Sequence, residues 1–234
     1  MKWEHNMKEG IYGIYGVGGF AREVMPTLRT YLSSIQDKSR LVFVSESSDE
    51  LKTKNINNHD VISLNDFINI KSPKKYLTLA VSNNKLREDL DTKLNSKEFK
   101  YFTIKALNSM TLDNVKIGDG AIICPYVTLT SNINIGKHFQ ANIYSYVAHD
   151  CQIGNYVTLA PAVKCNGNII IEDNVYIGTG AILKQGKKDK PLIIGKNSVV
   201  AAGSFVTKNV LKNTTVIGNP ANILKKSNIR SSDE

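Results

Sequence analysis

The amino-acid sequence predicts a mainly β protein, in which a parallel β-helix follows a small α/β domain. From Val115 to Gly186 the chain divides into consecutive six-residue units, and the third residue of every unit is apolar. Short repeats of this kind are typical of β-helices, in which each unit buries its apolar face by stacking on its neighbours. Residues 1–108 lack this repeat and alternate instead between apolar strand-like runs and segments with helical spacing.

In the N-terminal part, strands are expected at residues 11–15, 41–44, 76–81 and 101–105, and helices at residues 20–33, 64–70 and 84–94. The last helix is expected to bury Leu86, Leu90 and Leu94, which recur at fourfold spacing. Alternating strands and helices predict a parallel sheet. This domain, taken as residues 1–108, has about half the size of a doubly wound dinucleotide-binding fold.

Each six-residue unit is interpreted as one short strand and its corner, so that three units make one triangular coil. Glycine often follows the inward third residue, as at Gly118 and Gly136, where a tight corner leaves little room for a side chain. Residues 187–191 interrupt the repeat, which resumes at Leu192, and Lys212 at an inward position marks the end of the stack. The β-helix domain is therefore expected to cover residues 109–234, including a C-terminal tail.

Composition limits the class of protein. The sequence has no apolar run of about eighteen residues, and its first nine residues lack the apolar centre of a signal peptide. Its three cysteines form no CxxC pair, so neither a disulfide framework nor a zinc site is indicated. The net charge of +9 comes from lysines that are scattered and not striped along a helix, as a nucleic-acid-binding helix would have them. Polyanionic small molecules such as coenzyme A or nucleotide sugars explain the charge as well, and so does a solvated surface. We expect a cytoplasmic protein without a metal, a membrane segment or a nucleic-acid partner.

A glycine-rich turn lies between the first expected strand and helix. The segment from Gly16 to Ala21, which contains Gly18, Gly19 and Phe20, matches the pattern GxGxxA. At such a turn, backbone N–H groups and a helix N-terminus can hold phosphate oxygens. Glu46 follows the second strand, roughly where a dinucleotide-binding domain keeps its ribose-binding acid. The sequence predicts a mononucleotide group here, although such turns also serve close packing alone.

His149 is the candidate catalytic residue of the repeat. It is the fifth residue of its unit, so its side chain is expected to face outward near a corner, and Asp150 follows it. An imidazole beside a carboxylate is suited to general base catalysis, because the carboxylate fixes the tautomer and stabilises the imidazolium. An isolated surface histidine can also be inert. His138 is expected to be structural or peripheral.

These motifs together resemble those of the bacterial nucleotide-sugar acetyltransferases, which are left-handed β-helix proteins related to the sialic acid O-acetyltransferases. The resemblance covers nearly the whole chain and is carried by residues 15–24, 148–154 and 216–221. It implies left-handed winding, acetyl-CoA as co-substrate, and a homotrimer that binds coenzyme A in clefts between subunits. It also implies residue roles: His149 as the base, Asp150 as its partner, the Gly167 N–H on the acetyl carbonyl, and Gly16, Gly18 and Gly19 on the nucleotide.

The sequence departs from these relatives at three places. Several of them have histidine where this chain has Phe20, which changes the contacts expected there with the acceptor. Some have a second histidine on coenzyme A at the position of Thr158, so Thr158 is expected at that contact. The insertion at residues 187–191 is extra, and Lys187 and Lys188 in it are expected to attract the phosphates of coenzyme A.

The predicted activity is acetyl-CoA-dependent N-acetylation of a nucleotide-linked amino sugar for surface glycan biosynthesis, with a dTDP- or UDP-linked 4-amino-4,6-dideoxy sugar as the favoured acceptor. His149 takes a proton from the amine, which attacks the thioester directly, and the Gly167 N–H stabilises the oxyanion. Three alternatives remain. They are O-acetylation of a sugar such as sialic acid, a γ-type carbonic anhydrase, which needs three histidine ligands where the repeat has two, and a non-catalytic scaffold.

Overall fold

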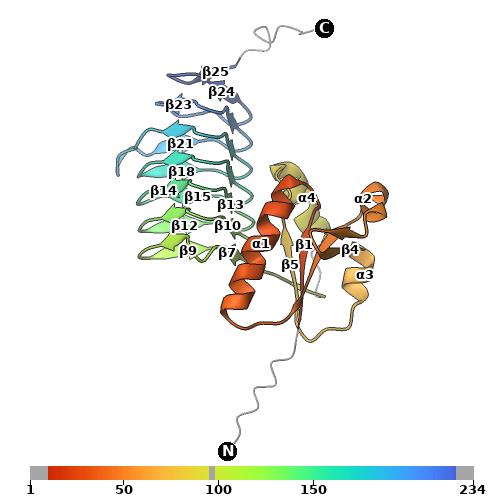
Figure 1. Cartoon of the computed structure of the whole chain (residues 1–234). Coiled ribbons are helices and arrows are strands. Elements are labelled where there is room, and N and C mark those ends of the chain that lie inside the picture. Colours follow the sequence, from red (N-terminus) through yellow and green to blue (C-terminus); the bar gives the residue numbers. More distant parts are fainter. Residues whose placement is uncertain (1–9, 95–97, 225–234) are drawn as a thin grey trace, which may run out of the picture.

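The computed structural model describes residues 10–94 and 98–224 and contains two parts, an α/β unit and a β-helix that stands beside it (Figure 1). In the α/β unit the elements are β1 (Ile11–Tyr15), α1 (Gly19–Ser34), β2 (Arg40–Ser45), α2 (Ser48–Lys52), β3 (Asn55–Ile56), β4 (His59–Ser63), α3 (Leu64–Asn69), β5 (Lys75–Leu79), α4 (Asn84–Lys93) and β6 (Lys100–Tyr101). The sheet has the order β3-β4-β2-β1-β5-β6 and is parallel except for β3.

The sequence predicted most of this unit. Three strands and three helices lie within a few residues of their expected positions, and the apolar face of α1 is buried as its spacing indicated. The short elements α2, β3 and β4 were not predicted. The strand expected over residues 101–105 is divided: β6 pairs with β5 in the α/β sheet, whereas Ile104 and Lys105 form β7, which pairs with β10 of the β-helix. The β-helix thus begins at Ile104.

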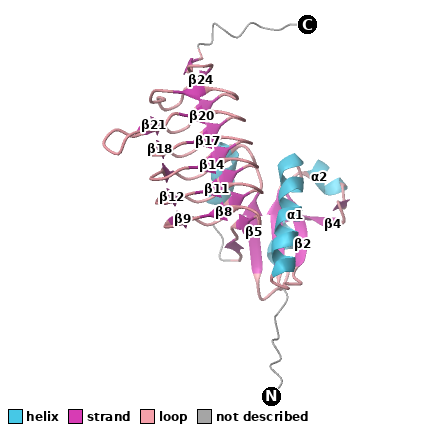
Figure 2. Ribbon diagram, turned by 60° about the vertical axis from the view of Figure 1, so that its left-hand side comes forward, coloured by secondary structure: helices cyan, strands magenta, loops and turns pink. Residues whose placement is uncertain are grey.

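The β-helix has three parallel faces, whose strands stack in columns (Figures 1 and 2). We call them face 1, face 2 and face 3. Face 1 contains β7 (Ile104–Lys105), β10 (Ile122–Ile123), β13 (Gln140–Ala141), β16 (Thr158–Leu159), β19 (Tyr176–Ile177), β22 (Val199–Val200), β24 (Thr215–Ile217) and the antiparallel β25 (Asn222–Ile223). Face 2 contains β8 (Met110–Thr111), β11 (Thr128–Leu129), β14 (Tyr146–Val147), β17 (Lys164–Cys165), β20 (Ile182–Leu183) and β23 (Phe205–Val206). Face 3 contains β9 (Val115–Ile117), β12 (Ile133–Ile135), β15 (Gln152–Ile153), β18 (Ile169–Ile171) and β21 (Leu192–Ile194).

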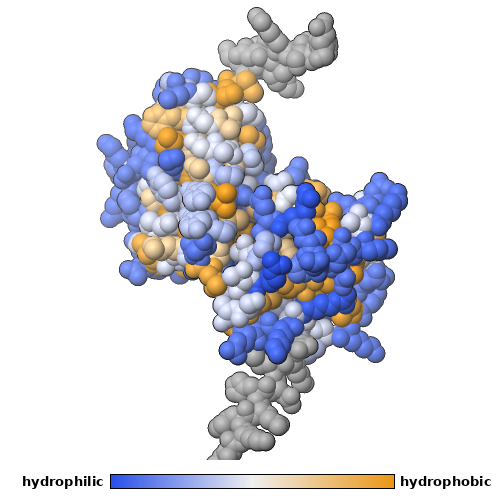
Figure 3. Space-filling view, viewed as in Figure 1, coloured by the Kyte–Doolittle hydropathy of each residue, from blue (hydrophilic) through white to orange (hydrophobic). Residues whose placement is uncertain are grey.

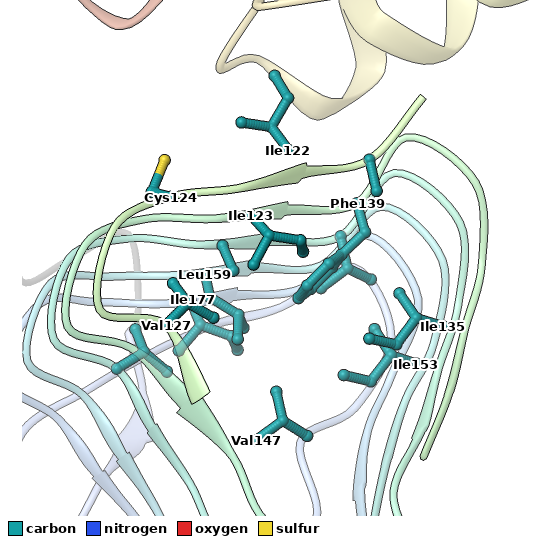
Figure 4. Close-up of a cluster of buried hydrophobic side chains, with 14 of the residues drawn as sticks. Ile122, Ile123, Cys124, Val127, Ile135, Phe139, Val147, Ile153, Leu159 and Ile177 are labelled. Carbon is teal, nitrogen blue, oxygen red and sulfur yellow. The ribbon is translucent and has the colours of Figure 1, made fainter. Parts of the chain in front are cut away.

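The third residue of each unit points into the prism, as predicted. Ile123, Leu159 and Ile177 from face 1 meet Val147 from face 2 and Ile153 from face 3 in the interior (Figure 4). Apart from the partly buried Val115, the first residue of each unit is buried as well, which the sequence pattern did not indicate. Phe139 belongs to this second set and fills the middle of the prism (Figure 4). Each unit therefore contributes two residues to the core.

The corners differ in detail from expectation. From Gly120 to Gly180 the sixth residue of every unit has a positive φ, and this set includes Asn132, His138 and Asp150. Gly118 and Gly136, which follow inward residues, do not have a positive φ. A Cβ at either glycine would lie 2.5–2.7 Å from atoms of the next coil, so glycine is needed there for close stacking and not for an unusual backbone angle.

The α/β unit packs against face 1 through α4. The Arg87 side chain is fully buried there and donates hydrogen bonds to the backbone oxygens of His138 (3.1 Å) and Tyr156 (2.7 Å). Leu86, expected on the buried face, is 48% exposed instead. The prediction was wrong because α4 packs against polar backbone of the β-helix, for which a long cation is a better partner than a leucine.

The contact covers only the lower coils of face 1. Gln140 on β13 is buried and donates to the backbone oxygens of Leu79 (3.0 Å) and Val81 (3.2 Å), at the carboxyl end of β5. Farther up the same face, Val199 on β22 is 36% exposed. The upper coils therefore rise free above the α/β unit, which leaves a step between the two parts (Figures 1 and 3).

Candidate active site

His149 and Asp150 lie at the corner between face 2 and face 3, in the loop that joins β14 to β15. The His149 Nδ1 is 2.7 Å from the Asp150 Oδ2, and the two side chains are 47% and 50% exposed. This outward position at a corner is the one that the sixfold repeat predicted. Because the carboxylate occupies Nδ1, the Nε2 is left to accept a proton from a ligand.

Asp150 is held in place from below. It occupies a column of corners with positive φ, whose other members are Asn114, Asn132 and Asn168. The Asn132 side-chain amide donates to Asp150 Oδ1 (3.2 Å), and Asn114 donates in turn to Asn132 (3.0 Å). The hydrogen bond with His149, followed by that from Asn132, keeps the pKa of the Asp150 carboxyl below its usual range. The carboxylate therefore stays charged and favours a protonated imidazole during proton transfer.

Gly167 lies one coil above His149 and faces its ring. A Cβ at position 167 would be 2.6 Å from His149 Nε2, so only glycine leaves the imidazole in this position. The next residue ties the two coils together, because the Asn168 N–H donates to the His149 backbone oxygen (2.9 Å). Within residues 10–94 and 98–224 no acceptor takes the Gly167 N–H. A donor is thus left unused beside the candidate base.

The insertion at residues 187–191 leaves the prism as a projecting loop next to β21 (Figures 1 and 2). Lys188 lines a pocket of about 420 Å³ together with Asp150, Gln152 and Asn168. Lys187 lines a different pocket, of about 500 Å³, with Lys184, Lys190 and Lys208. The two lysines that the sequence analysis grouped are therefore separated, and only Lys188 is adjacent to the His149 corner.

Thr158 does not lie in an open cleft. Its side chain is 2% exposed beneath α4, where its hydroxyl accepts from Arg87 (2.9 Å) and donates to Asn84 Oδ1 (2.7 Å). The expected contact between Thr158 and coenzyme A is therefore wrong for this structure. The residue helps to fasten the α/β unit to the β-helix.

The glycine turn has the geometry of an anion site. Gly16 has φ +112°, which favours glycine, and a Cβ at Gly18 or Gly19 would meet open space. Gly18 is the N-cap of α1 and supplies no side chain to cap it, and no acidic residue lies in the first turn. The first N–H groups of α1 are therefore available to phosphate oxygens. Phe20 is partly buried against the hydrophobic core, so its ring contributes to packing.

Glu46 lies at the same edge of the sheet, just after β2. Its carboxylate accepts from the Tyr15 hydroxyl (2.8 Å) and from Lys93 (2.7 Å). These contacts, that of Lys93 first, hold the pKa of the Glu46 carboxyl below its usual range. The carboxylate is charged and positioned beside the glycine turn, where it can accept hydrogen bonds from hydroxyl groups.

The two candidate sites lie at the same height but on opposite sides of one prism. The carboxyl edge of the α/β sheet is bound to Gln140 on face 1, and His149 belongs to the same coil at the corner opposite face 1. A face of six residues spans roughly 15–20 Å at about 3.3 Å per residue. A ligand held at the glycine turn is therefore separated from the His149 of its own chain by the width of the prism.

His138 is not a partner of His149. It is fully buried at the corner between face 3 and face 1, where its ring stacks on Tyr156 and meets the edge of Tyr101. Among the described residues, no three or more His, Cys, Asp or Glu side chains are grouped so as to hold a metal. The same part of the chain contains no helix that combines the length and apolar character needed to cross a membrane.

Known proteins resemble this chain along most of its length. The GDP-perosamine N-acetyltransferase of Escherichia coli O157:H7 is 46% identical over 218 residues, which cover 93% of this chain and 97% of the relative. The chain belongs to the hexapeptide-repeat acetyltransferase family. Residues 168–208 match the family model described as the hexapeptide repeat of succinyl-transferase. This membership excludes the carbonic anhydrase and scaffold alternatives and makes the chain an acyltransferase.

Solved structures confirm the predicted left-handed β-helix with its N-terminal α/β unit. WeeI from Acinetobacter baumannii AYE is 48% identical, with a TM-score of 0.85 over 92% of this chain and 99% of that chain. PerB from Caulobacter crescentus, solved in complex with CoA and GDP-perosamine, is 22% identical with a TM-score of 0.77 over 92% of this chain and 98% of that chain. At that identity the second comparison supports the fold alone.

Sequence reasoning missed Asn132, which supports Asp150. A signal was available, since Asn114, Asn132, Asp150 and Asn168 recur at the spacing of one coil. Asparagine is the residue, after glycine, that best tolerates a positive φ. The single acid in a column of asparagines therefore marks a position with a further role.

Proposed function

We propose that this chain transfers the acetyl group of acetyl-CoA to the amino group of a nucleotide-linked amino sugar. The observation that carries the proposal is the arrangement of His149, whose Nδ1 is bound to Asp150 and whose Nε2 lies against Gly167. The candidate base thus lies against a residue whose backbone N–H is unused. The name of the relative at 46% identity favours a GDP-linked 4-amino-4,6-dideoxy sugar, GDP-perosamine, over the dTDP- or UDP-linked sugars that the sequence favoured.

The reaction follows from these groups. The sugar nitrogen attacks the thioester carbonyl carbon while His149 Nε2 accepts a proton from the nitrogen. The Gly167 N–H donates to the oxyanion that develops on the acetyl oxygen. The C–S bond then breaks, and the imidazolium returns its proton to the leaving thiolate. The thioester is already activated, so no acetylated enzyme is required, and the site supplies mainly orientation.

The nucleotide sugar, which accepts the acetyl group, is assigned to the glycine turn because the first N–H groups of α1 are free there and Glu46 lies nearby. The pyrophosphate would lie at Gly18 and Gly19, and a ribose hydroxyl would donate to the Glu46 carboxylate. Coenzyme A is assigned to the flank of the prism near Lys188, whose charge suits its phosphates. Both substrates are products of cytoplasmic metabolism, and we place the reaction in the cytoplasm.

A homotrimer is the assembly that joins the two sites. The glycine turn and His149 of one chain lie on opposite sides of its prism, but at the same height. Three parallel prisms around a common axis bring the His149 corner of one copy toward the α/β unit of the next. Face 3 also carries an open groove of about 740 Å³ between Lys116 and Lys196, which a neighbouring copy can cover. The active site is then shared between subunits.

Complementation tests this shared site. His149→Asn removes the base, and Gly18→Asp puts a negative charge where the pyrophosphate should bind. Each variant alone should be inactive. Trimers that mix the two variants should regain activity, because some clefts combine an intact base with an intact nucleotide site. A mixture that stays inactive although sedimentation shows mixed trimers would contradict the shared site, as would a fully active monomer of 25.9 kDa.

The substrate is tested by measuring thiol release from acetyl-CoA with a panel of GDP-, UDP- and dTDP-linked sugars, each with an amino or a hydroxyl group at C4. We expect turnover with the GDP-linked amine. Turnover restricted to hydroxyl acceptors would show O-acetylation instead. Release of thiol with none of the sugars would contradict the proposal as a whole.

A further inference from the structure

The turn that carries Gly167 is held by the side chain of the preceding residue, Asn166. Its Nδ2 donates to the Leu183 backbone oxygen (2.7 Å) in the coil above, and its Oδ1 accepts from the Tyr146 hydroxyl (2.8 Å) in the coil below. Tyr146 is on β14, three residues before His149. One side chain therefore spans three successive coils of face 2.

The backbone of the turn is fixed by separate contacts. The Asn166 oxygen accepts from the Cys151 thiol (3.3 Å), the Gly167 oxygen from the Gly186 N–H (3.0 Å), and the Asn168 N–H is bound to His149. Of these peptide groups, the Gly167 N–H is the one with no acceptor in the described part of the chain. The two peptide groups that flank Gly167 are thus fixed, and the Gly167 N–H between them is unused.

We propose that Asn166 is a positioning residue that aims the Gly167 N–H at the reacting carbonyl, and that Tyr146 acts through Asn166. This inference rests on the proposed function. An oxyanion donor stabilises a transition state only when it is already at the right distance and angle, so the residues that fix its peptide plane affect the rate. The plane of the Asn166–Gly167 peptide can rotate about the backbone bonds on either side of it. Such a rotation would turn the Gly167 N–H away from the reacting carbonyl without unfolding the coil.

Two variants separate positioning from folding. Asn166→Ala removes both contacts, and Tyr146→Phe removes only the hydroxyl while the ring stays. We expect kcat to fall about 100-fold for Asn166→Ala, the lower end of the effect of losing one oxyanion donor. For Tyr146→Phe, which keeps the contact of Asn166 with Leu183, we expect a partial effect of about 10-fold. The KM values of both substrates should stay within about twofold, because neither residue is required to bind them. The double variant should be no slower than Asn166→Ala.

The pH dependence distinguishes this role from that of the base. Since a backbone N–H does not titrate in this range, the loss should be a constant factor at every pH, with the pKa values of the rate profile unchanged. The matched control is Ser204→Ala. Ser204 is buried and its hydroxyl accepts the Gly218 N–H (3.2 Å) from the next coil, so the variant loses a bond between coils far from His149. It should lower thermal stability but keep kcat.

Hydrogen exchange gives a readout that does not require turnover. The Asn168 amide should exchange faster in Tyr146→Phe than in the wild type, while amides of the lower coils are unchanged. Wild-type kcat in both variants, or a loss of kcat that Ser204→Ala reproduces, would overturn the inference and leave the proposed function intact. An inactive wild type would instead refute the proposed function, and with it the catalytic role of Asn166.

Discussion

Gly167 has no side chain because the His149 ring occupies the space in which one would lie, 2.6 Å from the position of a Cβ. The two residues are one coil apart, so the stacking of the β-helix places one above the other. The backbone of Gly167 and the imidazole Nε2 of His149 are thereby brought together on a rigid support. Together with the Asp150 carboxylate on the opposite ring nitrogen, this relationship makes activity sensitive to substitutions at Gly167 and Asp150.

Gly167→Ala should displace the His149 ring. Gly167 does not have a positive φ, so the backbone tolerates alanine and the fold should be kept. Because the methyl group and Nε2 cannot both occupy their positions, we expect kcat to fall about 100-fold or more. Steady-state kinetics and a melting curve check this. An active Gly167→Ala enzyme would show that His149 works from a different position.

Asp150→Asn should reduce activity without affecting the fold. Asparagine already occupies the same corner one coil below, at Asn132, and one coil above, at Asn168, so the substitution suits the positive φ. The imidazolium then loses its carboxylate partner. We expect a fall in kcat of about 10-fold, smaller than the loss for a variant of His149. A loss equal to that of His149→Asn would mean that Asp150 does more than orient and stabilise the ring.

Lys188→Ala should raise the KM for acetyl-CoA about two- to fivefold at low ionic strength, and the effect should fade as salt is added. The reason is the position of Lys188 in the pocket beside Asp150. Lys187→Ala is the matched variant, because Lys187 has the same charge but faces the other pocket, and its effect should be smaller. Equal changes in the two variants would show that only the overall charge of the loop matters.

The junction between the α/β unit and the β-helix should weaken in acid. Burial lowers the pKa of His138 from 6.5 to about 4, and it does so although the Asp91 carboxylate lies 3.2 Å away. Since the unfolded chain takes up this proton at higher pH than the folded one, stability should be lost as the pH falls from 6.5 toward 4. The full loss is about 2–4 kcal/mol. The carboxyl group of Asp91, with its pKa lowered to about 2, adds a loss only below pH 4.

Urea unfolding at pH 7 and pH 4.5 measures this effect. His138→Phe keeps the ring stacked on Tyr156 but cannot take up a proton. The difference in the free energy of unfolding between the two pH values should be smaller in this variant than in the wild type. The same difference in both proteins would assign the acid sensitivity to other groups.

What the sequence could predict was local and periodic. The inward third residues, the outward position of His149 and the glycine turn each follow from a spacing that can be counted along the chain. The first residue of each unit was missed, because Ser145, Ser198 and Ser204 break its apolar pattern although all three are buried. Side-chain burial at a corner depends on the neighbouring coil, which single-unit patterns do not describe.

The residues whose positions were wrongly predicted depend on contacts that a local pattern does not describe. Leu86 is exposed and Thr158 is buried because α4 lies on face 1, a contact between residues about seventy positions apart. Helical spacing and comparison with relatives give no information about such a contact. Lys187 and Lys188 were grouped because they are adjacent in sequence, whereas the turn between them sends their side chains to different pockets.

The central claim is that His149 is the base of acetyl transfer to a sugar amine, and the pH dependence of kcat for His149→Asn tests it most directly. The measurement is thiol release from acetyl-CoA with a GDP-linked 4-amino-4,6-dideoxy sugar, for the variant and the wild type. We predict a fall in kcat of about 100- to 10,000-fold at neutral pH, with trimer and acetyl-CoA binding retained. Partial recovery at high pH is expected, because a deprotonated amine needs the base less. Equal kcat values in the two proteins at every pH would contradict the claim.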